Sequence, residues 1–307
     1  MIALSSSPFV DRTDRNARGV PRGAPSRRFA HAIESIVLPA LVAALPWRVA
    51  WPALRMLVSR GGLFSDECER AHKVAASLGF GDDSTWRLTH GLTRAVDYAD
   101  PMLSAFRSDR WMARHLHVEG DALPGGACVF VGFHYGTGFW SLRHLRSAGH
   151  RVSFVSAPIG DAPSPLRSAL LHARQKQIAN AGGAPVIYVG GASDRIREQL
   201  RAGVSVLALI DVPEPGTATR SASLLDRKVV FPDGILRIAA AENVPMIGFI
   251  ASLDRASGAR RLRFVRLPSR PPDALSALAA LLDEAVRNDP ASWHFWAQWP
   301  RFLAARS

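Results

Sequence analysis

Hydrophobic residues in the second half of the chain gather into short runs that alternate with amphipathic stretches. The short runs predict strands at 127–133, 152–156, 185–189, 204–210, 228–231, 246–251 and 261–265. The amphipathic stretches predict helices at 138–147, 165–181, 192–202, 234–242 and 273–288. Strands that alternate with helices of this length are typical of βαβ units. We therefore expect an α/β fold with a mainly parallel central sheet flanked by helices.

The N-terminal part of the chain has different patterns. Residues 1–29 combine arginines with serine, proline and glycine, which predicts a disordered basic arm. Residues 36–47 are continuously apolar, but they are shorter than the roughly 20 residues that cross a bilayer. Trp47 and Trp51 stand beside Arg48 and Arg55, which favours a helical segment at 30–60 in the membrane interface over a buried helix hairpin. Residues 62–117 predict polar, amphipathic helices.

The charge balance is strongly basic. The formal net charge is +12 and the isoelectric point is about 11.0, which favours an anionic partner such as membrane lipid, an acidic carrier protein or nucleic acid. The sequence lacks the aromatic and basic signatures of common nucleic-acid-binding modules, so nucleic acid is not expected. The basic residues between 143 and 176 predict either a docking face for an acidic carrier or an ordinary solvated face. Cys68 and Cys128 are far apart, and no metal or cofactor site is predicted.

The stretch from Cys128 to Trp140 carries the strongest chemical signal. An apolar strand ends at His134, and Gly136 and Gly138 follow at once. Ligands of open α/β sheets bind beyond the carboxyl ends of the strands. A histidine in that place is a candidate general base, because its pKa lies near neutral pH. The alternative is a half-buried histidine in a turn, with glycines that only serve the turn.

Three other features carry weaker signals. Asp211 ends the strand at 204–210, where it is either an acid that orients His134 or a turn aspartate before Pro213. The polar loop at 214–221 contains Glu214 and Arg220, which could bind a charged headgroup, although an ordinary surface loop is favoured. Tryptophans 293, 296 and 299 recur at every third residue, and a core position is favoured over a membrane surface.

Several stretches, in this order, resemble the bacterial lipid A late acyltransferases, the lauroyl/myristoyl transferase family. They are the block Gly132-Phe-His-Tyr-Gly-Thr-Gly-Phe139, the helix and strand that end at Asp211, the stretch Phe231-Pro-Asp-Gly234, and the ending Asp289-Pro-x-x-Trp293-x-x-Trp296. The resemblance covers roughly residues 30 to 303. It implies an acyltransferase-like α/β domain over residues 61–307.

The resemblance also implies a reaction and a location. A fatty acyl group would move from an acyl-carrier-protein or acyl-CoA thioester to a hydroxyl or amine of a lipid or other amphiphile. The protein would act at the cytoplasmic face of the bacterial inner membrane, as a peripheral or monotopic protein, without metal or cofactor. His134 would be the general base, and the expected substrate-binding residues are Tyr135, Gly136, Thr137, Phe139, Glu214, Arg220, Asp233 and Gly234.

One residue departs from the family pattern. The family pairs its histidine with an acid five residues later, and that position is Phe139 here. A carboxylate from elsewhere could replace the acid, with Asp211 the first candidate before Glu214 and Asp233. Otherwise His134 acts alone, or the chain is a non-catalytic lipid- or carrier-binding protein. Hydrolysis of the thioester by water is a weaker alternative. A carboxylate at hydrogen-bonding distance from His134, about 2.6–3.2 Å, would favour the first alternative.

Overall fold

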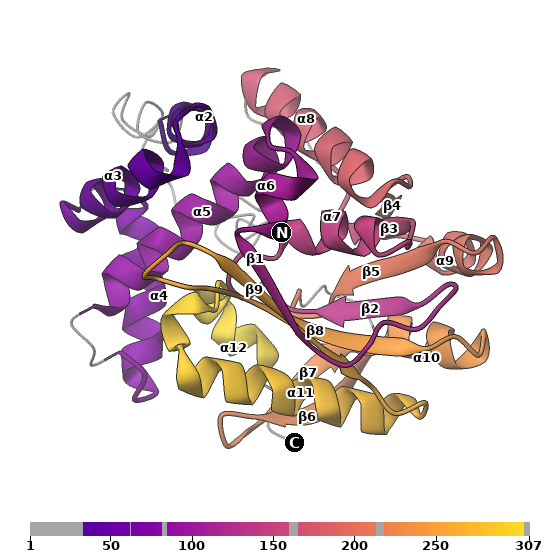
Figure 1. Cartoon of the computed structure of the whole chain (residues 1–307). Helices are drawn as coiled ribbons and strands as arrows, with labels where there is room; N and C mark the ends of the chain where they lie inside the picture. The colour runs from indigo at the N-terminus through magenta and orange to yellow at the C-terminus, as the bar shows by residue number, and fades with distance from the viewer. Residues whose placement is uncertain (1–32, 62, 82–84, 160–164, 213–217, 304–307) are drawn as a thin grey trace.

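The computed structural model describes residues 33–61, 63–81, 85–159, 165–212 and 218–303, so the predicted basic arm lies outside it (Figure 1). Its centre is a seven-stranded sheet in the order β1-β9-β8-β2-β5-β3-β4. Strands β8, β2, β5, β3 and β4 run parallel, whereas β9 is antiparallel to β8 and parallel to β1. The expected mainly parallel sheet is therefore confirmed. The strands are β1 Leu116–Gly120, β2 Val129–Gly132, β3 Val152–Ser156, β4 Ile187–Tyr188, β5 Ser205–Leu209, β8 Met246–Leu253 and β9 Arg260–Arg266.

Helices cover both faces of the sheet, and each face has its own hydrophobic core. Val129 and Val131 of β2 belong to one core, and Cys128 and Phe130 belong to the other. Burial on both faces explains why this strand reads as an uninterrupted apolar run. The first core contains α9 Ala192–Arg201, α10 Gly234–Ala241, α11 Pro271–Asn288, α12 Trp299–Phe302 and the hairpin of β6 Thr219–Leu224 and β7 Arg227–Pro232. The second contains α5 Trp86–Phe106, α7 Phe139–Ser147 and α8 Pro165–Gly182.

Two strands and one helix differ from the sequence prediction. Strand β1 is a short, mostly exposed edge strand, and β6 begins within the stretch 214–221 predicted as a surface loop. Both are polar and mostly exposed, so neither produces an apolar run. The helices at 62–117 are α4 Ser65–Ser77, α5 and α6 Asp109–Ala113. Helix α5 is not a polar surface helix, because most of it is buried, with Arg94, Asp97 and Asp100 inside the protein.

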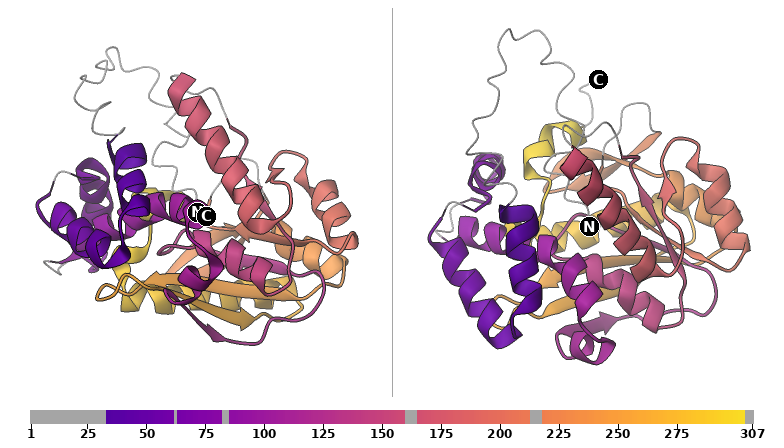
Figure 2. Two further views of the ribbon diagram at one scale, coloured as in Figure 1. Left: turned by 45° about the horizontal axis from the view of Figure 1, so that its top comes forward. Right: turned by 90° about the horizontal axis from the view of Figure 1, so that it is seen from above.

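The apolar N-terminal segment forms short helices at one side of the sheet (Figure 2). They are η2 Ile33–Val37, α2 Leu38–Ala44 and α3 Trp47–Ser59. The prediction that Trp47 and Trp51 lie at a membrane surface is wrong, because both rings are buried and stack at 5.6 Å. Their indole N–H groups donate to the carbonyl oxygens of Ser257 and Ala256 at 3.0 Å. Within the described ranges, no helix has both the length and the apolar character that crossing a membrane requires.

Candidate active site

The sheet brings His134 and Asp211 together from two neighbouring strands. Strands β2 and β5 are parallel, with Gly132 opposite Leu209. Each chain continues for two residues to its polar side chain, so His134 and Asp211 lie side by side beyond the carboxyl edge. The distance from His134 Nδ1 to Asp211 Oδ1 is 2.7 Å. The structure therefore provides a carboxylate at hydrogen-bonding distance from the histidine.

The Asp211 carboxylate is surrounded by hydrogen-bond donors. It accepts the backbone N–H of His134 at 2.8 and 3.0 Å and the indole N–H of Trp293 at 3.1 Å, in addition to the imidazole. The side chain is fully buried. An ionised carboxylate only accepts hydrogen bonds, so the imidazole proton lies on Nδ1. The lone pair of His134 is therefore on Nε2, which is the arrangement that a general base requires.

An apolar cavity of about 340 Å³ lies beside the histidine. His134 lines it together with backbone and side chains from the carboxyl ends of β3 and β5 and from the amino ends of α9 and α10. Most of its walls are hydrocarbon, and its apolar members include Phe154, Ile196, Ile210, Ile235, Ile238 and Phe295. A cavity of this kind suits an extended hydrocarbon chain with a reactive group next to His134.

The turn that carries His134 is packed closely against the sheet and the C-terminal segment. Gly136 adopts a φ of +61°, and a Cβ at this position would lie 1.9 Å from the carbonyl oxygen of Ala251. Only glycine fits there. The Gly136 N–H donates to the Ser292 carbonyl at 2.8 Å, and the His294 N–H donates to the His134 carbonyl at 2.9 Å. The glycine therefore serves the turn.

The C-terminal segment belongs to the site, although its residues taken one by one predict only core positions. Trp293 bonds Asp211, His294 bonds the backbone of the turn, and the Phe295 ring meets the His134 ring edge-on at 4.6 Å. The signal that indicates this role is the C-terminal signature of the resembled family. The expectation that tryptophans 293, 296 and 299 are core residues is confirmed, because all three are buried.

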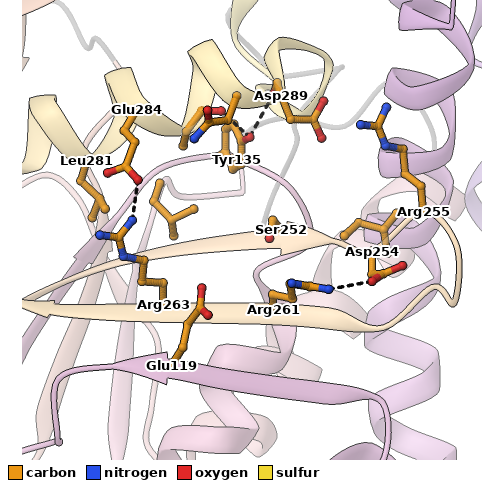
Figure 3. Close-up of a pocket in the computed structure, with 14 residues that line it drawn as sticks. Glu119, Tyr135, Ser252, Asp254, Arg255, Arg261, Arg263, Leu281, Glu284 and Asp289 are labelled. Carbon is orange, nitrogen blue, oxygen red and sulfur yellow. Dashed lines mark hydrogen bonds and ion pairs between the residues drawn. The ribbon is translucent and has the colours of Figure 1, made fainter.

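The residues that follow His134 lie away from the apolar cavity. Phe139 is 1% exposed and belongs to the core on the α5 and α7 side of the sheet. Thr137 is fully buried. Tyr135 points to the opposite side and donates its hydroxyl hydrogen to the carbonyl oxygens of Ala285 and Asp289, at 2.7 and 3.0 Å (Figure 3). Of the residues predicted to bind substrate, Gly234 lines the cavity. Tyr135, Gly136, Thr137 and Phe139 do not line it.

A second cavity of about 380 Å³ lies on the far side of Tyr135, and charged side chains make up part of its wall (Figure 3). Two ion pairs lie in its wall: Arg261 with Asp254 at 2.9 Å and Arg263 with Glu284 at 2.8 Å. These four side chains neutralise each other in pairs. The His134 imidazole lines the apolar cavity, so we place the candidate site there.

Three other predicted site residues, Arg220, Asp233 and Gly234, form a group next to the cavity. Gly234 lines the cavity wall. Asp233 precedes it and accepts the Nε–H groups of Arg220 and Arg237, each at 3.1 Å. Asp233 is thus occupied by two arginines, and it is Asp211 that pairs with His134. Glu214 lies outside the described residues.

Two buried histidines near the turn make the free energy of unfolding depend on pH. Burial is the largest cause, and the charge of Arg94 is the second. Together they lower the pKa of His90 to about 3 and hold the pKa of His294 well below its usual value. The unfolded chain takes up protons on both groups near pH 6.5. We expect the free energy of unfolding to fall as the pH drops below 6.5, by up to about 1.4 kcal/mol per pH unit for each histidine.

Urea unfolding between pH 7.5 and 5 measures this slope. The matched variant is His294→Gln, whose amide can donate to Gly136 and accept from Arg94 without titrating. Other titrating groups affect both proteins equally, so the variant should lose one histidine's share of the slope. Equal slopes in the two proteins would contradict the assignment.

No protein-family model matches the chain, and no curated protein is significantly similar to it.

Proposed function

We propose that the protein transfers a fatty acyl group from a carrier-protein or coenzyme A thioester to a hydroxyl or amine of an amphiphile. The observation that carries the proposal is the 2.7 Å hydrogen bond between His134 Nδ1 and Asp211 beside an apolar cavity. Asp211 supplies the acid that the resembled family has at the position of Phe139. The same observation weighs against a non-catalytic binding protein, which has no need of an oriented imidazole.

The proposed chemistry is direct transfer. His134 Nε2 takes the proton of the acceptor hydroxyl or amine while the acceptor oxygen or nitrogen attacks the thioester carbonyl carbon. The tetrahedral intermediate then expels the thiolate, which receives the proton from the imidazolium. Asp211 holds the ring and stabilises its positive charge.

A thiol-release assay tests the proposal. The protein is incubated with an acyl-CoA, with and without a long-chain alcohol or amine in micelles, and free thiol and acylated product are measured together. We expect thiol release that depends on the acceptor and matches the product. Equal release without acceptor would mean hydrolysis, and binding of acyl-CoA without any release would mean a non-catalytic protein.

The size of the cavity should limit the length of the acyl chain. Ile238 lines it from α10, and the variant Ile238→Trp would fill part of its volume. We expect the preferred donor to become shorter, with about a tenfold loss in kcat/KM for each methylene that no longer fits. A series of acyl-CoA lengths measures this, and the shortest donors serve as the internal control. An unchanged length preference would place the chain elsewhere.

The N-terminal helices supply a surface for peripheral membrane association. Beside their buried side, α2 and α3 expose large apolar side chains, including Leu41 at 53% and Val49 at 54%. Arg48 and Arg55 are exposed among them, and basic residues next to apolar ones suit an anionic lipid surface. We propose that this surface rests on the cytoplasmic face of a bacterial inner membrane, which would bring an amphiphilic acceptor to the site.

Vesicle binding tests this surface. We expect Leu41→Glu, Val49→Glu and Met56→Glu each to weaken binding to anionic phospholipid vesicles about tenfold, because each removes apolar burial and adds a repelled charge. Val118→Glu on edge strand β1 is the matched control, since Val118 is similarly exposed but lies outside these helices. Equal effects of the control and the helix variants would point to net charge alone.

The predicted carrier-docking face has fewer available charges than its sequence indicates. Arg143 bonds Asp109 at 2.6 Å and also donates to the carbonyl oxygens of Ser104 and Arg107. Arg146 donates to the carbonyl of Asn180 at 2.6 Å. These bonds hold the helices around α7 together. Docking of an acidic carrier therefore rests on the overall positive charge, and coenzyme A thioesters are the simpler first donors to test.

A further inference from the structure

The turn that carries His134 is held by hydrogen bonds to a clasp segment, which we define as residues 289–295. Two backbone bonds join them, from Gly136 N–H to Ser292 and from His294 N–H to His134. The Tyr135 hydroxyl adds bonds to Ala285 and Asp289 at the end of α11 (Figure 3). The position of the imidazole therefore depends on what holds the clasp segment.

The side chain of His294 adds a bond whose direction can be assigned. His294 Nε2 lies 2.7 Å from the Gly136 carbonyl oxygen. A carbonyl oxygen only accepts hydrogen bonds, so the proton of this neutral ring lies on Nε2. Its Nδ1 must then accept, and Arg94 Nη1 lies 2.8 Å from it. A guanidinium only donates, so both neighbours require the same tautomer.

Arg94 is itself fixed inside the protein. The side chain is 1% exposed, and its Nη2 pairs with Glu67 of α4 at 2.6 Å. Its guanidinium also lies over the Tyr98 ring, with 5.6 Å to the ring centroid. A continuous chain of polar contacts thus runs from α4 to the turn, through Glu67, Arg94, His294 and Gly136. The cation excludes a proton from His294 Nδ1, because a second buried positive charge next to it would be strongly repelled.

We propose that Arg94 is a positioning residue for His134, acting through His294: it holds His294 in the Nε2–H tautomer, and that N–H holds the Gly136 carbonyl of the turn. This inference rests on the proposed role of His134 as a general base. Arg94 contacts His294, Glu67 and the Tyr98 ring, so it acts on His134 only through the turn.

Amide hydrogen exchange of three variants tests the inference. Arg94→Met with Glu67→Gln removes the cation without leaving an unpaired carboxylate. Arg94→Lys keeps the charge and one donor for His294. The matched control is Arg260→Met with Asp100→Asn, which removes another buried arginine pair that α5 contributes to but that does not bond the turn.

The readout is the exchange rate of the Gly136 and His294 amides relative to the Val206 amide, which bonds Cys128 inside the sheet. The ratio cancels any general loss of stability. We expect it to rise about ten- to hundredfold in Arg94→Met with Glu67→Gln. It should stay near the wild-type value in Arg94→Lys and in the control. An unchanged ratio in the first variant, or an equal rise in the control, would overturn the inference.

Exchange does not require turnover, so this test can be read even if the wild type transfers no acyl group. If transfer is measured, Arg94→Met with Glu67→Gln should lower kcat and leave KM unchanged, because Arg94 does not line the cavity. A rise in KM with constant kcat would instead assign Arg94 to substrate binding and contradict the positioning role.

Discussion

Replacing His134 by alanine is expected to lower acyl transfer by about 10⁴-fold or more. The variant has no group at Nε2 to take the acceptor proton, so the attack on the thioester would rely on water. Its cavity keeps the apolar walls that bind the acyl chain. The effect should therefore fall on kcat, and a non-reactive alkyl thioether of coenzyme A should bind with nearly wild-type affinity.

The fold of this variant should survive, because Asp211 keeps two of its contacts. The backbone N–H of residue 134 and the Trp293 indole still donate to the carboxylate. Circular dichroism and thermal unfolding check this point. His172→Ala is a suitable control, since His172 is exposed on α8. Unchanged turnover of His134→Ala would rule out the role of this residue as the base.

His134 and Asp211 each end an apolar run, so the sequence predicts that both lie at the carboxyl edge of a parallel sheet. Their contact joins residues 77 positions apart. It requires β2 and β5 to be neighbours, which no local pattern reveals. The sequence therefore identifies both side chains as candidates, but it does not show that they pair.

Phe139 illustrates the opposite case. The family resemblance presents this position as a missing acid, and the structure gives it a packing role at the start of α7. Glutamate there would bury a charge in an apolar core. We therefore expect Phe139→Glu to destabilise the protein rather than to raise the transfer rate, and thermal unfolding with the thiol-release assay distinguishes the two results.

The buried polar network could not be predicted for a different reason. Arg94 and His90 lie in a stretch whose composition is typical of solvated helices, and His294 lies in a tryptophan-rich ending. Polar residues are usually exposed, so their burial follows only from the contacts between α5 and the clasp segment. Trp47 and Trp51 resemble membrane anchors in sequence, and in the structure they pack against the turn after β8.

Replacing Asp211 by asparagine should have the second largest effect, a loss of about 10³–10⁴-fold in kcat. Every group that faces the carboxylate is a donor, namely the His134 backbone and ring and the Trp293 indole. The asparagine NH₂ would donate to the imidazole Nδ1, so the ring proton would move to Nε2. The imidazole lone pair would then lie on Nδ1, which faces residue 211, and Nε2 could no longer take the proton of the acceptor.

Trp293→Phe is the matched control for Asp211→Asn. It removes only the indole donor and leaves both bonds between Asp211 and His134, so we expect less than about a tenfold loss in kcat. Nitrogen-15 NMR of the His134 ring distinguishes the two cases, because only Asp211→Asn should move the proton from Nδ1 to Nε2. A near-wild-type rate for Asp211→Asn would mean that the carboxylate only completes the hydrogen bonds of the turn. The imidazole would then act without an acid partner, and Phe139 would mark a real loss rather than a replacement from the neighbouring strand.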